Sequence, residues 1–298
     1  GLGDTENRTI PVQVGSATGW ISVSAGDYHT LGVRSDGTLW AWGSNGSGQL
    51  GLGDTENRTI PVQVGSATGW ISVSAGSYHT LGVRSDGTLW AWGSNGAGQL
   101  GLGDTANRTS PVKVGSATGW VLMSAGYLHT LGIRSDGTLW AWGYNTYGRL
   151  GLGDTTQRTS PALVSGGSTV QVAGITPTVS AGDYHTLGVR SDGTLWAWGY
   201  NGAGQLGLGN TQDRTSPVQV GSDTGWVSVS AGDYHTLGVR SDGTLWAWGY
   251  NASGQLGLGD TTNRTSPVQV GSATGWISVS AGDYHTLGVR SDGTLWAW

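Results

Sequence analysis

Residues 29–42 read HTLGVRSDGTLWAW, and nearly the same letters return once in every later repeat of the chain. Two β-prone runs, residues 29–34 and 38–42, flank the turn formers Ser35, Asp36 and Gly37. This pattern predicts a β-hairpin. Two loops fit the turn: a two-residue loop, or a three-residue loop with Gly37 in the left-handed region.

Packing favours the three-residue loop. In that register Gly32 faces Trp40, so an aromatic ring covers a residue that has no side chain. The other face of the hairpin then carries only the apolar side chains of Leu31, Val33, Leu39 and Ala41. In either register both faces are apolar or small, so each sheet must be covered on both sides. We expect Trp40, Trp42 and their equivalents to be buried between sheets and to carry most of the stability.

The chain of 298 residues is built from six repeats. They occupy residues 1–50, 51–100, 101–150, 151–206, 207–256 and 257–298. We expect one domain, residues 1–298, that is an excerpt of a longer chain. The fourth repeat is longer because it holds six extra residues near 165–175.

The rest of each repeat supplies two more strands. Residues 11–14 form a short run opened by proline, which suits an edge strand, and residues 21–25 alternate apolar and small polar side chains. The 56 glycines disfavour long helices. The sequence therefore predicts an all-β protein, a β-propeller of four-stranded antiparallel blades. It forms either a ring of six blades or an incomplete ring of seven. In a closed six-bladed ring, residues 11–14 would pair with the strand ending at Trp298.

Residues 24–51 read SAGDYHTLGVRSDGTLWAWGSNGSGQLG, which resembles the repeat of the regulator of chromosome condensation (RCC1) superfamily, in its bacterial-type form. The resemblance covers all six repeats and implies a propeller with WD40-like architecture. It also implies a choice of functions, because the family includes guanine-nucleotide exchange factors for a small GTPase, protein inhibitors of enzymes, and repeat proteins without known activity.

Composition excludes several classes of protein. The chain has no cysteine, which excludes disulfide frameworks and thiolate metal sites, and its net charge is −5 with the arginines spread along its length. We therefore expect no nucleic-acid partner, and the lack of a long apolar run predicts no membrane span. Composition does not fix the compartment; we favour an extracellular or cell-surface location in a prokaryote. Near-identical repeats predict exchange of blades between chains.

Three motifs imitate catalytic or cofactor sites. Residues 46–51 match the dinucleotide pattern G-x-G-x-x-G, but no helix follows to hold a pyrophosphate, so we expect no cofactor. Histidine occurs once in every repeat, whereas a catalytic or metal site needs its ligand once; we interpret these residues as structural side chains bonded to loop backbone. Ser24, His29 and Asp36 are too far apart along one strand to form a triad. The protein is predicted not to be an enzyme.

All ten tyrosines lie in two loop types that antiparallel strands send to the same end of the propeller. The loop after residues 25–26 carries Tyr28, Tyr78, Tyr127, Tyr184, Tyr234 and Tyr284. The long loop after residues 42–43 carries Tyr144, Tyr147, Tyr200 and Tyr250. Either these rings pack on their own loops, or they form a face that binds another protein.

The third repeat departs from the others in these two loops. Its distinctive residues are Tyr127, Leu128, Tyr144, Thr146, Tyr147 and Arg149. Tyrosine and arginine are enriched at interface hot spots, so we place the centre of the binding face here. A local packing variant is the alternative. The sequence thus favours a non-enzymatic protein-interaction module over an exchange factor and over a purely structural repeat. An exchange factor would need a partner-specific loop that acts as a wedge, and the insertion near residues 165–175 is the only candidate for it.

Overall fold

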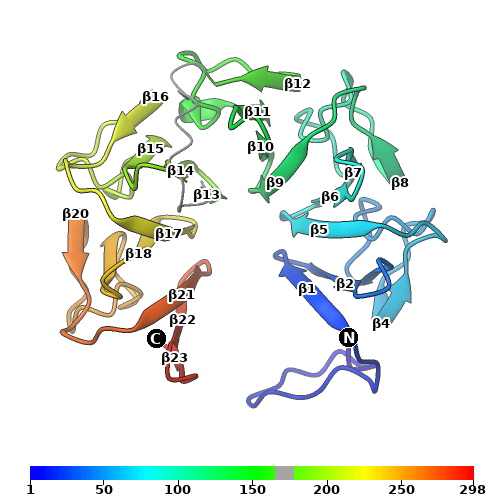
Figure 1. Ribbon diagram of the computed structural model, residues 1–298, viewed down its shortest axis with the longest axis horizontal. Helices are drawn as coiled ribbons and strands as arrows, with labels where there is room; N and C mark the ends of the chain where they lie inside the picture. The colour runs from blue at the N-terminus through cyan, green and yellow to red at the C-terminus, as the bar shows by residue number, and fades with distance from the viewer. Residues whose placement is uncertain (165–177) are drawn as a thin grey trace.

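The computed structural model describes residues 1–164 and 178–298, and these form six antiparallel sheets around a central axis (Figure 1). The first sheet contains β1 (Trp20–Ala25), β2 (His29–Arg34), β3 (Leu39–Gly43) and β4 (Arg58–Gln63). The predicted β-propeller of six blades is confirmed.

The insertion near residues 165–175 lies outside the described residues. In the described part of the chain, no helix is long and apolar enough to cross a membrane.

The remaining blades repeat this order. The second has β5 (Trp70–Ala75), β6 (His79–Arg84), β7 (Leu89–Gly93) and β8 (Arg108–Lys113). The third has β9 (Trp120–Ala125), β10 (His129–Arg134), β11 (Leu139–Gly143), the short 3₁₀ turn η1 (Thr146–Gly148) and β12 (Arg158–Leu163). The fourth has β13 (Thr178–Ala181), β14 (His185–Val189), β15 (Leu195–Gly199) and β16 (Arg214–Gln219). The fifth has β17 (Trp226–Ala231), β18 (His235–Arg240), β19 (Leu245–Gly249) and β20 (Arg264–Gln269). The sixth has β21 (Trp276–Ala281), β22 (Thr286–Arg290) and β23 (Leu295–Ala297).

In each of the first five blades the outermost strand comes from the next repeat. β4 belongs to the second repeat by sequence, yet it pairs with β3 of the first. The proline-opened strand predicted at residues 11–14 has its equivalent here, beginning at Arg58. Successive blades are therefore joined covalently at their rims as well as packed face to face.

The hairpin register is the predicted one. Gly32 pairs with Trp40, and Gly37 has a φ of 75°, as the three-residue loop requires. The ring that covers Gly32 was predicted wrongly. A β-carbon on Gly32 would collide with the ring of Trp20, because an irregularity in β1 between Trp20 and Ser22 turns that ring over the glycine.

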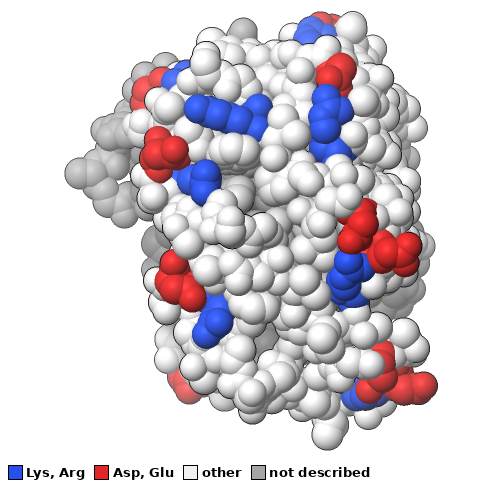
Figure 2. All heavy atoms as spheres, turned by 90° about the vertical axis from the view of Figure 1, so that its right-hand side faces the viewer, with Lys and Arg blue, Asp and Glu red and all other residues white. Residues whose placement is uncertain are grey.

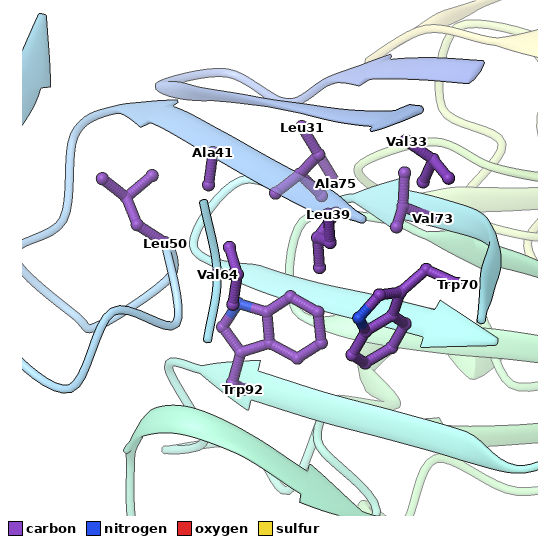
Figure 3. Close-up of a cluster of buried hydrophobic side chains, with 10 residues drawn as sticks. All are labelled: Leu31, Val33, Leu39, Ala41, Leu50, Val64, Trp70, Val73, Ala75 and Trp92. Carbon is purple, nitrogen blue, oxygen red and sulfur yellow. The ribbon is translucent and has the colours of Figure 1, made fainter. Parts of the chain in front are cut away.

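The core lies between blades and not within them. Leu31, Val33 and Leu39 of the first blade meet the rings of Trp70 and Trp92 from the second (Figure 3). The three aliphatic side chains are fully buried, and equivalent clusters recur around the ring. Stability therefore depends on the contact of each blade with its neighbour.

The ring is open between the first and last blades (Figure 1). On the first blade Val23 is 68% exposed, whereas its equivalent Val73 is 8% exposed; on the last blade Leu287 is 38% exposed, whereas Leu237 is fully buried. Closure through residues 11–14 was predicted wrongly. These residues form no strand, and β23 pairs only with β22. The six blades therefore form a ring whose first and last blades do not pair.

The long loops carry short-range ion pairs. Asp54 contacts Arg58 at 2.6 Å, and the same i, i+4 pair recurs in four other repeats. Figure 2 shows acidic and basic side chains adjoining in pairs on one side of the molecule. Because these side chains are largely exposed, solvent screening leaves each pair little effect on stability. They fix loop conformation and leave no basic patch on that side.

Candidate functional site

One end of the propeller collects the loops that join β1 to β2 and β3 to β4, with their equivalents, as the antiparallel order requires. Tyr28 stacks on Tyr78 with ring centroids 5.2 Å apart, and Tyr78 meets the edge of Tyr127 at 6.1 Å. Three consecutive blades thus join their rings into one row. Tyr28 remains 53% exposed.

A second group of rings continues around the same end. Tyr184 stacks on Tyr234 at 4.9 Å, and Tyr200 touches both of them. Tyr147 of the third repeat reaches Tyr200 at 4.8 Å, and Tyr250 meets Tyr234 at 6.3 Å. The long-loop tyrosines and the short-loop tyrosines are therefore brought together. Tyr284 is 55% exposed and has no ring contact among the described residues.

Arg149 lies beneath these rings and is only 1% exposed. Its Nε donates to the carbonyl of Thr146, and a terminal nitrogen donates to the carbonyl of Asp183 at 2.6 Å. Its guanidinium carbon is 5.1 Å from the ring centre of Tyr144 and 5.4 Å from that of Tyr184. Arg149 therefore positions rings from two blades by hydrogen bonds and cation–π contacts.

The substitution at position 149 explains the altered loop around it. In the first repeat the Gln49 side-chain oxygen accepts the backbone N–H of Ser47, and arginine has no acceptor to replace it. The third repeat forms η1 instead, with Tyr147 at a φ of 65°, which side chains other than glycine seldom adopt. Leu128 accepts the backbone N–H of Tyr144 and is half-buried. The same backbone bond recurs in other blades, so the altered geometry of the third repeat is confined to the loop around Arg149.

Four aspartates at this end were not predicted as site residues from the sequence. Asp27, Asp183, Asp233 and Asp283 each precede a loop tyrosine. Burial, followed by repulsion from the other three carboxylates, raises the pKa of Asp183 to about 7. Burial, with repulsion from Asp283 and Asp27, raises the pKa of Asp233 to about 6. The recurring Asp-Tyr pair was the signal in the sequence that could have revealed them.

The histidines link neighbouring blades. Nε2 of His29 lies 2.8 Å from the hydroxyl of Thr80 in the second blade, and the same contact joins each later pair of blades at distances up to 3.4 Å. The expected partner, loop backbone, was wrong. The side chain reaches a threonine of the next repeat because the core packs blade against blade.

The rest of this network sets the protonation of the ring. The Thr80 hydroxyl and the Trp92 indole both donate to the carbonyl of Gln49. Since the hydroxyl proton is used there, Nε2–H of His29 is the donor to Thr80, and Nδ1 is unprotonated. Nδ1 has no hydrogen-bond partner among the described residues. Burial lowers the pKa of His29 to about 4 and that of His79 to about 3.

The two tryptophans of each hairpin differ in burial. Trp92 and its equivalent Trp142 are completely buried between blades, as predicted. Trp90 and Trp140 are half-buried, which corrects the prediction for the first ring of each pair. Each lies beside an arginine, with the Arg84 guanidinium carbon 5.3 Å from the ring centre of Trp90. Substitution of the buried ring, Trp92 or Trp142, therefore reports the stability of the contact between blades better than substitution of the half-buried ring.

A model of the RCC1-like domain matches residues 1–224, and models of the RCC1 repeat match residues 226–255 and 242–289. The chain belongs to the RCC1-like domain family. It is also similar to the ultraviolet-B receptor UVR8 of Arabidopsis thaliana, with 52% identity over 42 residues. That match covers 14% of this chain and 10% of UVR8.

Solved structures share the fold of this RCC1-like domain. Yeast RCC1 (Prp20), crystallised with Kap60, has a TM-score of 0.81 at 22% identity, covering 94% of this chain and 69% of its own. Human WBSCR16 has a TM-score of 0.80 at 23% identity, covering 91% and 72%. A second structure, of Prp20p from Saccharomyces cerevisiae, has a TM-score of 0.81 at 22% identity, covers 94% and 71%, and was described with its binding to Gsp1p and histones.

The polar side chains that imitate a triad are engaged separately in this RCC1-like domain. The Ser24 hydroxyl accepts the backbone N–H of Ala75, and the Asp36 carboxylate accepts from Thr38. Within residues 1–164 and 178–298, no group of three or more acidic, histidine or cysteine side chains is placed to hold a metal ion. The tyrosines and aspartates of the loop end are the remaining candidates for a functional site.

The raised pKa of Asp183 predicts a stabilising substitution. Its folded-state pKa, about 7, lies above the value of about 4 expected on unfolding, so folding loses stability as pH rises between those values. We expect Asp183→Asn to raise the free energy of unfolding by about 1–3 kcal/mol at pH 8 and by less at pH 5.5. Thermal melts at the two pH values check this. A variant that melts at or below the parent at pH 8 would contradict it.

Proposed function

We propose that this RCC1-like domain is a non-enzymatic protein-interaction module that binds its partner through the tyrosine-bearing loop end. The observation that carries the proposal is the joining of tyrosines from successive blades into partly exposed rows. Rigid aromatic side chains supply large contact areas at little cost in conformational entropy, and for this reason they are frequent binding hot spots.

The third repeat is the proposed centre of this face. Arg149 is buried, so its contribution is to hold the rings of Tyr144, Tyr147 and Tyr184 in place from below. Pre-organisation of this kind reduces the entropy lost when a partner binds. The strained φ of Tyr147 is further support, since such backbone is retained most often where a side chain has a function.

The partners of a structural neighbour agree with a binding role. Yeast Prp20 is described in complex with Kap60 and as binding Gsp1p and histones, all of them proteins. An exchange-factor function is the second candidate, favoured by the same likeness to Prp20. Its proposed wedge, the insertion near residues 165–175, lies outside the described residues, so the tyrosine rows support the first candidate more directly.

Selection from a random peptide library displayed on phage tests the proposal. We expect selected peptides to lose at least about tenfold in affinity when Tyr28→Ser and Tyr78→Ser are combined with Tyr147→Gly. The control combines Ile71→Ser and Val121→Ser, which remove exposed apolar side chains from strand ends remote from the tyrosine loops. Equal binding to the tyrosine variant and the parent would overturn the proposal.

Reversion of the third repeat tests where the centre lies. We expect the combined substitutions Tyr127→Asp, Leu128→Tyr and Arg149→Gln to weaken the same peptides by about tenfold, because the rings lose their support. Circular dichroism and a thermal melt monitor the fold. Unchanged affinity with an unchanged fold would show that the centre lies elsewhere on the face.

A further inference from the structure

The four aspartates of the loop end lack the partners that other aspartates of the chain have. Asp54 pairs with Arg58, and Asp36 accepts hydrogen bonds from Thr38. By contrast, no hydrogen bond or ion pair engages the carboxylates of four residues in the described part of the chain: Asp27, Asp183, Asp233 and Asp283. Hydrogen bonds and ion pairs within the described residues therefore do not explain why these four positions carry aspartate.

Their position brings them together. Each lies in the short loop between the innermost strand of a blade and the next strand, so all four lie near the propeller axis at the same end (Figure 1). We call this set of loops the channel mouth. Their mutual repulsion contributes to the raised pKa values of Asp183 and Asp233. Arg149 is the nearby cation, and its described hydrogen bonds go to backbone carbonyls. The mouth is thus acidic, and Arg149 offsets only part of this charge, through a favourable interaction with Asp183 that lowers the pKa of that carboxyl.

Aromatic faces stand beside these carboxylates. Tyr184 and Tyr234, which follow Asp183 and Asp233, are stacked on each other. A guanidinium binds well where carboxylates accept its N–H groups and aromatic faces lie against its plane. Metal ions are disfavoured here, because no three acidic side chains of the described residues converge closely enough to coordinate one.

The chain already holds one guanidinium against tyrosine rings, with backbone carbonyls as its acceptors. Arg149 lies against the rings of Tyr144, Tyr147 and Tyr184 while donating to the carbonyl of Asp183. This contact shows that the loop end can accommodate a guanidinium among its tyrosines. It also leaves the carboxylate of Asp183 free for a second one.

We propose that the channel mouth, defined by Asp27, Asp183, Asp233, Asp283 and the tyrosines that follow them, binds an arginine-bearing basic segment of a partner protein. The inference rests on the proposed function and adds the chemistry of the partner. Charge complementarity selects a basic segment over an acidic one. The tyrosine faces select arginine over lysine, because the flat guanidinium stacks on rings whereas an ammonium is more strongly hydrated.

Fluorescence anisotropy with synthetic peptides tests the proposal. The probes are labelled peptides of equal length that alternate glycine with arginine, lysine or glutamate. We expect the arginine peptide to bind most tightly, the lysine peptide more weakly and the glutamate peptide not measurably. Added salt is expected to weaken the arginine complex. Equal affinities for the arginine and glutamate peptides would overturn the proposal.

Charge-matched variants locate the binding site. Asp183→Asn with Asp233→Asn removes two carboxylates from the mouth, and we expect about tenfold weaker binding of the arginine peptide. Glu6→Gln with Glu56→Gln removes the same charge from exposed loop positions and is expected to change affinity by less than about twofold. An equal loss in both variants would mean that net charge alone drives binding, and would overturn the proposed site.

The phage selection separates failure of this inference from failure of the proposed function. Peptides that depend on the tyrosines, are rich in arginine and weaken on Asp183→Asn support both proposals. Peptides that depend on the tyrosines but are not basic, and bind the aspartate variant normally, overturn this inference and leave the function standing. Peptides indifferent to the tyrosines overturn both.

Discussion

Acidification to about pH 5 is expected to unfold this propeller, although most of its carboxylates are still ionised there. The cause is the set of buried histidines that link the blades. Burial lowers the pKa of His29 and His235 to about 4, lowers that of His79 and His185 to about 3, and lowers that of His129 as well. The unfolded chain binds these protons near pH 6.5. The contribution of the neutral histidines to the free energy of unfolding is therefore fully present above that pH and is lost as pH falls towards 4.

Two carboxylates oppose this trend. Asp183 and Asp233 have raised folded-state pKa values, so they bind protons before the unfolded chain does. Five histidines less two aspartates leave a net uptake of about three protons on unfolding near pH 5. The free energy of unfolding should then fall by about 4 kcal/mol for each pH unit.

Denaturant titrations at several pH values between about 7 and 5 measure this slope directly. The control is His79→Gln, whose amide can still donate to Thr130 but does not titrate, so the slope should decrease by about one proton. A free energy of unfolding that stays constant over this range would contradict the assignment of neutral buried histidines.

Replacing the buried tryptophan Trp142 by alanine is expected to destabilise the protein by about 3–5 kcal/mol. Its ring is fully enclosed between the second and third blades, and its indole N–H donates to the carbonyl of Gln99 at 2.9 Å. The substitution leaves a cavity at one interface and removes one of the two hydrogen bonds to that carbonyl, which keeps the Thr130 hydroxyl as a donor. Because the core is shared between neighbours, two blades should lose stability together.

Trp140 provides a matched comparison two residues away. It is half-buried, and its indole N–H donates to Thr138 of its own blade. We expect Trp140→Ala to cost about half as much as Trp142→Ala, because the half-buried ring loses less apolar area. Thermal and denaturant unfolding of both variants measure the difference. A larger loss for Trp140→Ala would contradict the assignment of the core.

The hairpin could be predicted because neighbours in the sequence determine its register. Gly37 permits the turn, and the alternation around it leaves one consistent pairing of Gly32 with Trp40. The ring over Gly32 could not be predicted in the same way. Trp20 belongs to another strand, and the irregularity that turns its ring appears only once β1 pairs with β2.

Contacts between repeats were harder to predict, because repetition makes equivalent residues indistinguishable. The sequence contains a threonine beside every histidine, yet His29 bonds Thr80 of the next blade and not Thr30 of its own. Similarly, the Asp-Tyr pairs are visible in the sequence, but the absence of partners for Asp183 among the described residues is a property of the folded loops. The end of the molecule that carries the tyrosines, in contrast, follows from strand direction alone.

The hydrogen bonds that join successive blades do not depend on the side chains of the loops that we propose for binding. Every link uses a histidine and a carbonyl from one repeat with a threonine and a tryptophan from the next, so any two copies fit in either sequential order. The third repeat keeps this link although its loops have changed, since Arg149 offers the same carbonyl that glutamine offers elsewhere. Substitutions can therefore accumulate in the loops of one repeat while the links between blades stay intact. In this way binding specificity can change during evolution without loss of the fold.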